Sequence, residues 1–454
     1  MTAPFPRRWQ AHIGGRVPRY TSYPTADRFS ASVRGDTAKS WLAALDPAAP
    51  LSLYVHVPFC RKLCLYCGCN TRIVSRHRPI GAFAQDLAGE IDATAAALPQ
   101  GMRVRHLHFG GGTPTALSPR EFAAVVDRLR NRFDFAPDAE IAVEIDPRNL
   151  GGDMIAALAD AGVTRASLGV QDFDPAVQRA VNRLQPASLV AETALALRGA
   201  GIARVSFDLI YGLPLQTPDT VALTADLAAM MRPDRVALFG YAHVPWMKPH
   251  QKALERHGLP DTKARWDMAR AAEARLVEAG YERVGMDHFA LPGDVLAASA
   301  RDGRLRRNFQ GYTADDCPAL IGFGPSAISA LPQGYAQAPA DIADWRAALT
   351  RGDAPVARGI ALGDDDLLRR TAIERLMCDM RVDLADVCRP FGVDPEAEFA
   401  DELDRLVALE EEGIVTLDGM RVGMAEAARP LVRSVAAVFD AYLVPGPARH
   451  AVAV

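Results

Sequence analysis

Residues 51–70 read LSLYVHVPFCRKLCLYCGCN, a short alternating stretch that runs directly into a group of cysteines. Apolar and polar residues alternate over 51–57, which is the period of a strand with one apolar and one polar face. The loop that follows carries four cysteines in the spacing C-x3-C-x2-C-x-C, namely Cys60, Cys64, Cys67 and Cys69. Three thiolates on one compact loop can face three corners of an iron–sulfur cube, which leaves the fourth iron open for a small ligand. The segment therefore predicts a strand followed by a catalytic iron–sulfur site.

Two other uses of these thiols stay open at this point. A zinc site generally takes two separated pairs of ligands, whereas all four thiols here lie on one loop without a distant pair. A thioredoxin-like C-x-x-C formed by Cys64 and Cys67 would leave Cys60 without a role. The isolated cysteines read as small buried side chains; they are Cys317, Cys378 and Cys388.

Strands alternate with helices as far as residue 290. The strand candidates span 51–57, 104–109, 140–145, 164–170, 203–210 and 235–241. Amphipathic stretches separate or follow them, among them 80–98, 118–133, 186–200 and 262–279. Repeated strand–helix units predict a parallel sheet with right-handed connections.

The alternation inside these strands favours a barrel over a doubly wound sheet. Ser206 and Asp208, for example, flank the apolar Phe207. A doubly wound sheet is covered on both faces and should be apolar throughout, whereas a barrel around a polar pocket gives the observed pattern. In such barrels the site lies at the carboxyl ends of the strands, where Glu144, Gln171 and Asp208 fall. We therefore predict an α/β fold, a partial (βα)6 TIM-like barrel.

The rest of the chain divides around this barrel. We expect an irregular N-terminal extension over 1–50, the barrel over 51–290, a loop-rich segment that completes the active site over 291–362, and a smaller, mainly helical domain over 363–454. In the last region, 414–417 and 420–424 are joined by Asp418-Gly419 and predict a hairpin with a tight turn. Helices followed by such a hairpin suggest a winged-helix-like module. Its acidic helix favours a docking or lid role over DNA binding.

The composition excludes several classes of protein. The 454 residues carry 51 basic and 55 acidic side chains, a net charge of −4, without the basic surplus that nucleic-acid binding usually needs. We find no secretory signal and no run of roughly 18 apolar residues, so we expect a soluble, cytoplasmic protein without a membrane span. An odd total of seven cysteines argues against a disulfide framework.

The cysteine motif and its setting resemble the radical S-adenosylmethionine (SAM) superfamily, which places a C-x3-C-x2-C loop after the first strand of a full or partial barrel. The string HFGGGTPT (108–115) resembles that superfamily's motif for the SAM amino group, and its glycines allow close approach of the backbone and positive φ. The resemblance implies a 4Fe–4S cluster on Cys60, Cys64 and Cys67 whose open iron binds SAM. Reductive cleavage of SAM would yield methionine and a 5′-deoxyadenosyl radical.

Longer strings are similar to those of the oxygen-independent coproporphyrinogen III oxidases. They extend from residue 18 to FDAYL near the C-terminus and comprise PRYTSYPT, EIDPR, GVQDFDPAVQRAVNR, DLIYGLP, GYAHVP, GMDHFA, RRNFQGYT and GPSAIS. Cys69, in CGCN, fits the oxidases better than their haem-chaperone relatives. The resemblance implies conversion of two propionates of coproporphyrinogen III to vinyl groups, giving protoporphyrinogen IX. The radical would take a β-hydrogen, after which the substrate radical loses CO2 and one electron.

The resemblance also implies two bound SAM molecules. The residues matching the first site are Tyr54, Gly111, Glu144 and Ile328. Those matching the second are Gly112, Thr113, Gln171, Arg183, Asp208 and Ala242, with Tyr66 beside the cluster. The guanidinium of Arg183 suits a SAM carboxylate. Salt bridges to Arg165 or Arg204 are the simpler alternative for Glu144 and Asp208.

The four carboxylates of the implied substrate require cationic or hydrogen-bonding groups at the barrel mouth. The candidates are Arg301, Arg304, Arg306, Arg307, Arg19, Tyr20 and Tyr23, with a solvated charged face as the alternative. His56, His243 and His288 are candidate participants or hydrogen-bonded core residues. Three roles stay open for Cys69: substrate binding, radical relay, or a purely structural role in the loop.

Two rival functions stay open at the level of sequence. One is a radical SAM relative that handles or degrades haem, and the other is a non-enzymatic interaction protein with a zinc-stabilised loop. The oxidase interpretation implies coproporphyrinogen III as substrate, a low-potential electron donor protein as partner, and a monomer.

Overall fold

The computed structural model describes residues 5–443, so residues 1–4 of the predicted extension and 444–454 of the predicted C-terminal domain lie outside it. Its main sheet has twelve strands, and six of them run parallel in chain order, each followed by at least one helix. These six are β1 (Leu51–Val57), β4 (Arg103–Gly111), β5 (Asp134–Ile145), β6 (Arg165–Gln171), β7 (Arg204–Tyr211) and β8 (Arg235–Gly240). The order starts at β16 (Arg358–Ala361) and ends at β9 (Glu282–Val284), so the barrel is open. The predicted partial (βα)6 barrel is confirmed.

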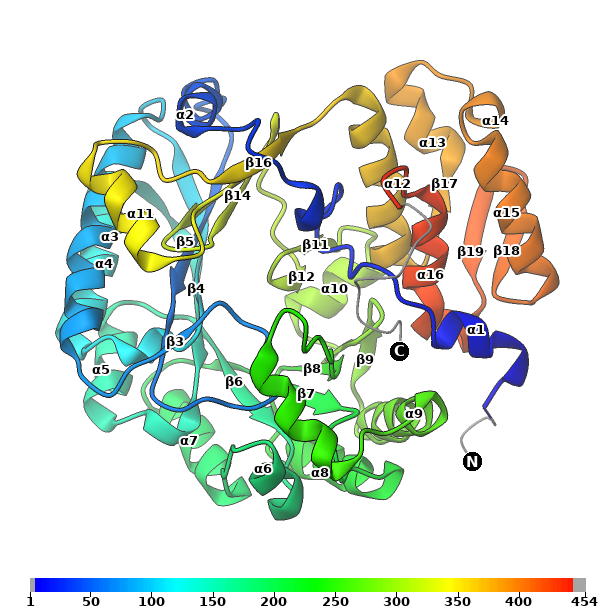
Figure 1. Cartoon of the computed structure of the whole chain (residues 1–454), viewed down its shortest axis with the longest axis horizontal. Helices are drawn as coiled ribbons and strands as arrows, with labels where there is room; N and C mark the ends of the chain where they lie inside the picture. Colours follow the sequence, from blue (N-terminus) through cyan, green and yellow to red (C-terminus); the bar gives the residue numbers. More distant parts are fainter. Residues whose placement is uncertain (1–4, 444–454) are drawn as a thin grey trace.

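Helices cover the outer, apolar face of these strands (Figure 1). The main ones are α3 (Arg78–Ala96), α4 (Pro119–Arg132), α5 (Gly152–Asp160), α7 (Ala187–Gly199), α8 (Pro218–Met230) and α9 (Thr262–Glu278). The four that the sequence predicts agree to within two residues at each end. Ser118 and Glu121 form a capping box that starts α4, and Phe122 of α4 packs on Phe109 of β4 with ring centroids 4.8 Å apart.

The segment 291–362 is not the loop-rich region that the sequence predicts. It supplies four strands to the main sheet, namely β13 (Ala319–Phe323), β14 (Ile328–Leu331), β15 (Gly334–Gln337) and β16, and the helix α11 (Ile342–Thr350). β13 pairs in parallel with β1 and sets Gly322 opposite Tyr54. A Cβ on Gly322 would lie 2.8 Å from the carbonyl oxygen of Ile328, so the strand needs this glycine. Glycine weakens the strand signal in a sequence, which explains the wrong prediction.

Ion pairs fill the amino-terminal end of the lumen. Glu140 of β5 accepts hydrogen bonds from Arg165 of β6 at 3.3 Å and from Arg204 of β7 at 3.2 Å. Burial alone would raise the pKa of Glu140, but the nearby positive charges, that of Arg165 above all, lower it to about 2. Among the described residues, the salt bridges considered for Glu144 and Asp208 therefore do not form.

The C-terminal domain combines helices with a small sheet. It starts with α12 (Asp364–Asp379) and contains β17 (Arg381–Asp383), β18 (Val415–Asp418) and β19 (Arg421–Met424). The predicted hairpin is formed by β18 and β19, and Gly419 in its turn has φ +57°. No helix in the part of the chain that the structure describes is long and apolar enough to cross a membrane.

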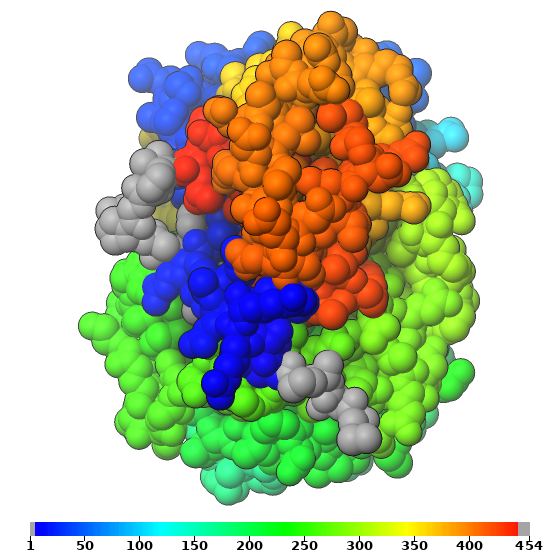
Figure 2. Space-filling view, turned by 90° about the vertical axis from the view of Figure 1, so that its right-hand side faces the viewer, coloured from blue at the N-terminus to red at the C-terminus, as the bar shows by residue number. Residues whose placement is uncertain are grey.

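The N-terminal segment lies between the barrel and the C-terminal domain: its blue ribbon passes between them in Figure 1, and its blue atoms lie between the orange and green atoms in Figure 2. Trp9 donates its indole N–H to the carbonyl of Glu412 at 2.9 Å, and the Tyr20 hydroxyl donates to Oδ2 of Asp440 at 3.0 Å. Further along, the backbone of Ser30 pairs with Gly359 of β16. The extension thus ties the two larger units together.

Candidate active site

The four clustered cysteines lie on the loop between β1 and α3, at the carboxyl ends of the strands. Short strands β2 (Phe59–Cys60) and β3 (Arg72–Ile73) pair across this loop. The backbone N–H of Leu65 donates to the carbonyl of Val181 at 2.9 Å. From the loop after β8, the Gln251 side chain donates to the carbonyl of Tyr66 at 2.9 Å. Bonds from separate elements therefore hold the cysteine loop in place.

Hydroxyl and thiol groups surround two of the predicted cluster ligands. The hydroxyls of Thr71 and Thr113 each lie 3.3 Å from Sγ of Cys60. A hydrogen bond with the Cys69 thiol lowers the pKa of Cys67 to about 6. Because the thiolate is the form that binds iron, these donors fit a thiolate-bound cluster.

Two arginines flank the third predicted ligand, Cys64. Nη2 of Arg148 and Nη1 of Arg183 each lie 3.4 Å from its Sγ. Asp146 holds both, at 2.6 Å from Nη2 of Arg148 and 3.4 Å from Nη2 of Arg183. Positive charge beside Cys64 likewise fits a thiolate ligand. Sequence reasoning missed Asp146 and Arg148 as site residues, although both belong to the EIDPR string that it singled out.

A polar layer lines the lumen directly beneath the cysteine loop. The Tyr54 hydroxyl lies 3.0 Å from Nδ1 of His56, and the Tyr54 ring stacks on His108 with centroids 5.9 Å apart. Nε2 of His108 lies 3.3 Å from Oε1 of Glu144, whose Oε2 accepts from the backbone N–H of Gly111 at 3.2 Å. The structure thus brings Tyr54, Gly111 and Glu144 together.

Asp208 adds a second carboxyl group to the lumen, on β7. It accepts hydrogen bonds from the hydroxyl of Ser167 at 3.3 Å. Burial and the nearby charge of Glu144 raise the pKa of Asp208 to about 7, against the opposing effects of His108 and Arg183. A cationic ligand in the lumen would favour the carboxylate form of Asp208.

The glycines that end β4 permit a close contact inside the chain. Gly111 has φ +109°, and a Cβ there would lie 2.8 Å from the His56 ring. A Cβ on Gly112 would lie 2.5 Å from Oγ1 of Thr71 and 2.7 Å from the carbonyl oxygen of Phe59. The predicted close approach is therefore, in this structure, the approach of β4 to the cysteine loop itself.

The remaining predicted cofactor residues lie at the same end of the barrel. Gln171 ends β6 with φ +70°. The carbonyl of Ala242 accepts from Gln251 at 3.2 Å, and the same side chain binds Tyr66 of the cysteine loop. Ile328 begins β14, whose neighbour β13 pairs with β1.

The other two candidate histidines, His243 after β8 and His288 at the start of β10 (His288–Ala290), each contact a nearby carboxylate. Nε2 of His243 lies 3.0 Å from Oε1 of Glu255, and Nδ1 of His288 lies 2.7 Å from Oδ1 of Asp287.

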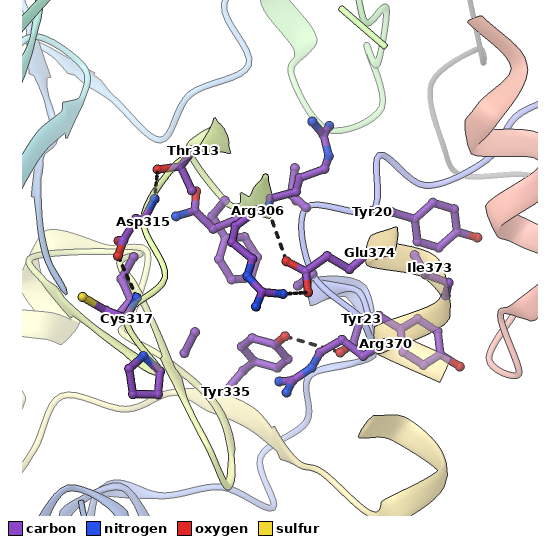
Figure 3. Close-up of a pocket in the computed structure, with 18 of the residues that line it drawn as sticks. Tyr20, Tyr23, Arg306, Thr313, Asp315, Cys317, Tyr335, Arg370, Ile373 and Glu374 are labelled. Carbon is purple, nitrogen blue, oxygen red and sulfur yellow. Dashed lines mark hydrogen bonds and ion pairs between the residues drawn. The ribbon is translucent and has the colours of Figure 1, made fainter. Parts of the chain in front are cut away.

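A cavity of about 370 Å³ lies on the lumen side of β13 and β14, where the N-terminal segment and α12 close it (Figure 3). Among the candidate substrate residues it is lined by Tyr20, Tyr23, Arg306 and Arg307. Arg301 and Arg304 do not line it, since they form exposed ion pairs with Glu282 and Asp302.

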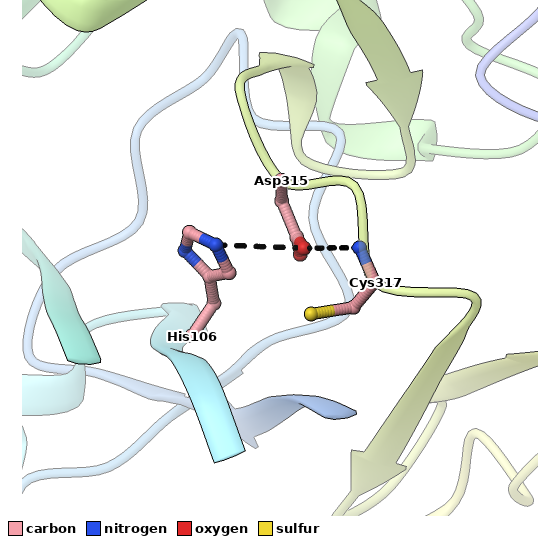
Figure 4. A group of neighbouring side chains, drawn as sticks. All are labelled: His106, Asp315 and Cys317. Atoms are coloured by element: carbon pink, nitrogen blue, oxygen red, sulfur yellow. Dashed lines mark hydrogen bonds and ion pairs between the residues drawn. The ribbon is translucent and has the colours of Figure 1, made fainter. Parts of the chain in front are cut away.

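Figure 4 shows a compact group of three potential metal ligands, His106, Asp315 and Cys317, the last two of which also line this cavity. Nε2 of His106 lies 3.6 Å from Oδ1 of Asp315, which also accepts from the backbone N–H of Cys317 at 3.0 Å. The Ser52 hydroxyl donates to the same carboxylate. Burial and the Asp315 charge raise the pKa of Cys317 to about 12. These bonds fasten the turn at 315–317 to β1 and β4.

Comparison with known proteins gives consistent results. Residues 54–228 match the family model described as the radical SAM superfamily. The chain is 49% identical over 439 residues to the oxygen-independent coproporphyrinogen III oxidase of Bradyrhizobium diazoefficiens, covering 97% of each chain. It is 39% identical over 426 residues to the enzyme of the same name from Escherichia coli, covering 94% of this chain and 93% of that one. The solved Escherichia coli coproporphyrinogen III oxidase, a radical SAM enzyme, superposes with a TM-score of 0.90 at 37% identity, covering 94% of this chain and all of that one.

Proposed function

The chain belongs to the oxygen-independent coproporphyrinogen III oxidases of the radical SAM superfamily, and on this premise we propose how its residues serve the reaction. It is an oxidoreductase of haem biosynthesis that oxidatively decarboxylates two propionates of coproporphyrinogen III to vinyl groups, giving protoporphyrinogen IX. Its cofactors are a 4Fe–4S cluster and SAM. Similarity along nearly the whole chain favours this function over a haem-handling relative and over a zinc-stabilised interaction protein.

Cys60, Cys64 and Cys67 would hold the cluster, with Cys69 as a neighbour that donates to Cys67. The observation that carries this proposal is the set of polar groups within hydrogen-bonding distance of the sulfur atoms: two threonine hydroxyls at Cys60 and two guanidiniums at Cys64. When bound, the cluster and SAM supply the 5′-deoxyadenosyl radical that removes a hydrogen atom from the substrate. The chain itself orients the reactants and excludes water.

Two groups of residues would bind two SAM molecules. Tyr54, Gly111, Glu144 and Ile328 form the first group. Gly112, Thr113, Gln171, Arg183, Asp208 and Ala242 form the second, with Tyr66 beside the cluster. Support comes from the charges, because Glu144 and Asp208 suit the cationic parts of SAM, whereas Arg183 suits its carboxylate.

Other features of the protein stay predictions. They are a low-potential electron donor protein as partner, a monomeric state and a cytoplasmic location.

Anaerobic turnover tests the proposed function. The reconstituted protein is incubated with SAM, a strong reductant and coproporphyrinogen III, and the products are separated by liquid chromatography. We expect 5′-deoxyadenosine and protoporphyrinogen IX, with about four irons per chain before the reaction. Formation of 5′-deoxyadenosine without a vinyl product would keep the radical chemistry and exclude this substrate, and one zinc per chain in place of iron would exclude both.

A further inference from the structure

Four arginines from four separate parts of the chain meet at the barrel mouth. Arg19 comes from the N-terminal segment, Arg265 from α9, Arg307 from β11 (Arg306–Asn308) and Arg433 from α16 (Val432–Ala436). Each of the four acts electrostatically on Tyr211 or on another member of the group. We call them the arginine cluster.

Hydrogen bonds fix the cluster at the ends of the barrel strands. Nη2 of Arg19 donates to the carbonyl of Gly240, the last residue of β8, at 3.0 Å. Nη2 of Arg307 donates to the carbonyl of Arg19 at 3.2 Å, and Nε of Arg433 donates to the carbonyl of Pro18 at 2.9 Å. Three of the four guanidiniums, those of Arg19, Arg307 and Arg433, thus donate to backbone carbonyls.

The members of the cluster act on one another through their positive charges. Burial, together with the charges of Arg19 and Arg307, lowers the pKa of Arg433 to about 9. The carboxylate that opposes this effect is Asp287, which is itself bonded to His288. Like charges repel one another, so an anion bound beside Arg19 and Arg307 would favour their charged forms.

Arg307 has hydrogen-bonding capacity that the described chain does not use. Its Nε and Nη1 are buried and have no hydrogen-bond partner among the described residues. Its guanidinium lies 4.4 Å from the ring centroid of Tyr312, which holds the plane of the fork in one orientation. Buried donors without a partner are costly, and they mark positions where a ligand can supply the acceptor. Arg19, by contrast, is exposed and gives access to the cluster.

The cluster adjoins the residues proposed for the reaction. Gly240 precedes Ala242 by two residues, and Tyr211 follows Asp208 by three along β7. Arg307 also lines the cavity beside β13 and β14. A ligand group at the cluster would thus belong to a molecule that extends into the barrel mouth.

We propose that Arg19 and Arg307, with Arg265 and Arg433 as flanking charges, form the subsite that binds a propionate retained by the product. This rests on the proposed function, in which two of the four substrate carboxylates react and two stay. A planar guanidinium pairs with a carboxylate through two parallel hydrogen bonds, so the subsite also selects for a carboxylate at that place on the macrocycle. The exposed Arg301 and Arg304, equally plausible from the sequence, take no part.

The test uses enzyme loaded with the 4Fe–4S cluster. The variants are Arg307→Gln, Arg307→Lys and Arg19→Gln, and Arg301→Gln is the matched control. Affinity is measured by absorbance titration with coproporphyrin III, the stable tetracarboxylate, and with its tetramethyl ester. Turnover gives KM and kcat for coproporphyrinogen III. We expect Arg307→Gln to raise the Kd and the KM by about tenfold or more, with the KM for SAM and the cluster absorbance unchanged. Arg307→Lys should recover part of the loss.

The ester separates charge recognition from a purely structural effect. Wild type and Arg301→Gln should bind the acid at least about tenfold more tightly than the ester, and Arg307→Gln should lose most of that difference. Equal acid-to-ester ratios in wild type, Arg307→Gln and Arg19→Gln would overturn the proposal. Wild-type enzyme that binds coproporphyrin III through Arg307 but forms no vinyl product would refute the proposed function and leave the subsite standing.

Discussion

Asp208 and Glu144 place two carboxyl groups in one buried lumen, with His108 and Arg183 as the facing charged or titratable groups. Burial raises the pKa of Asp208 to about 7 from an ordinary value near 4, so the group is partly protonated at neutral pH. A raised carboxyl pKa stabilises the ligand-free fold at low pH, and this contribution is lost as the pH rises toward 7.

We expect SAM binding to release a proton from Asp208. The cationic groups of SAM favour the carboxylate, so affinity should rise by up to about tenfold between pH 6 and pH 8. Calorimetric titration of the cluster-loaded protein in buffers of different ionisation enthalpy measures both the affinity and the proton release. Asp208→Asn should weaken binding and flatten the pH profile, and an unchanged profile in that variant would show that Asp208 is not the titrating group.

A second prediction concerns the iron content of the cysteine variants. Cys60→Ala, Cys64→Ala and Cys67→Ala should each reduce bound iron from about four per chain to a small fraction, because three thiolates are the proposed ligands. Cys69→Ala should keep the iron and its absorbance. Iron analysis after anaerobic reconstitution checks both, and loss of iron in the Cys69 variant would make the ligand assignment wrong.

At the scale of elements, the junction between β4 and the cysteine loop decides how the site is assembled. Gly112 is packed against Phe59 and Thr71, on either side of the cysteines. Gly112→Ala should push the loop away, since the added Cβ would lie 2.7 Å from a backbone carbonyl that cannot rotate aside. We expect lower iron occupancy and at least about tenfold weaker SAM binding, by the loss of one or more aligned hydrogen bonds.

A matched control for this prediction is Gly68→Ala in the cysteine loop, where an added Cβ meets nothing within 4 Å. Iron content and SAM affinity near the wild-type values are expected for it. Equal losses in both variants would indicate general sensitivity of the loop in place of the specific contact.

At the scale of the molecule, the N-terminal segment joins the barrel to the C-terminal domain. Tyr20 donates to the buried Asp440, and burial raises the pKa of that carboxyl group. Tyr20→Phe would leave the carboxyl without this donor, so we expect a loss of about 1–3 kcal/mol in the free energy of unfolding. Denaturant titration measures it, with the exposed Ser40→Ala as a control that should change by less than about 0.5 kcal/mol. A Tyr20→Phe variant as stable as Ser40→Ala would show that the hydrogen bond from Tyr20 to Asp440 does not help to join the two units.

The sequence was sufficient for the barrel because its strands are local patterns. Alternation over 51–57 and over the five later strands reports which face of each strand meets the helices, and this follows from the period of a strand alone. The segment around β13 carried no such signal. Gly322 and its neighbours form a strand only because β1 lies beside them, and Tyr54, the partner of Gly322, precedes it by 268 positions in the chain.

The candidate site shows the same division. The cysteine spacing and the strings around Glu144 and Asp208 indicated the chemistry, since those residue types are required by it wherever the chain places them. Arg301, Arg304, Arg306 and Arg307, however, look alike in sequence. Only the fold separates the exposed ion pair of Arg301 with Glu282 from the buried, partly unpaired guanidinium of Arg307.

By itself the sequence determined the barrel, the cysteine loop and the family, because period, spacing and residue type are properties of short stretches. The tertiary structure alone decided which charges pair and which stay available. Pairing depends on distance and burial. Residues as far apart in the sequence as Arg19, Arg265 and Arg433 meet only when the N-terminal segment, the barrel and the C-terminal domain pack together. The four cysteines lie within ten residues of the sequence, whereas the arginine cluster is assembled from four distant segments.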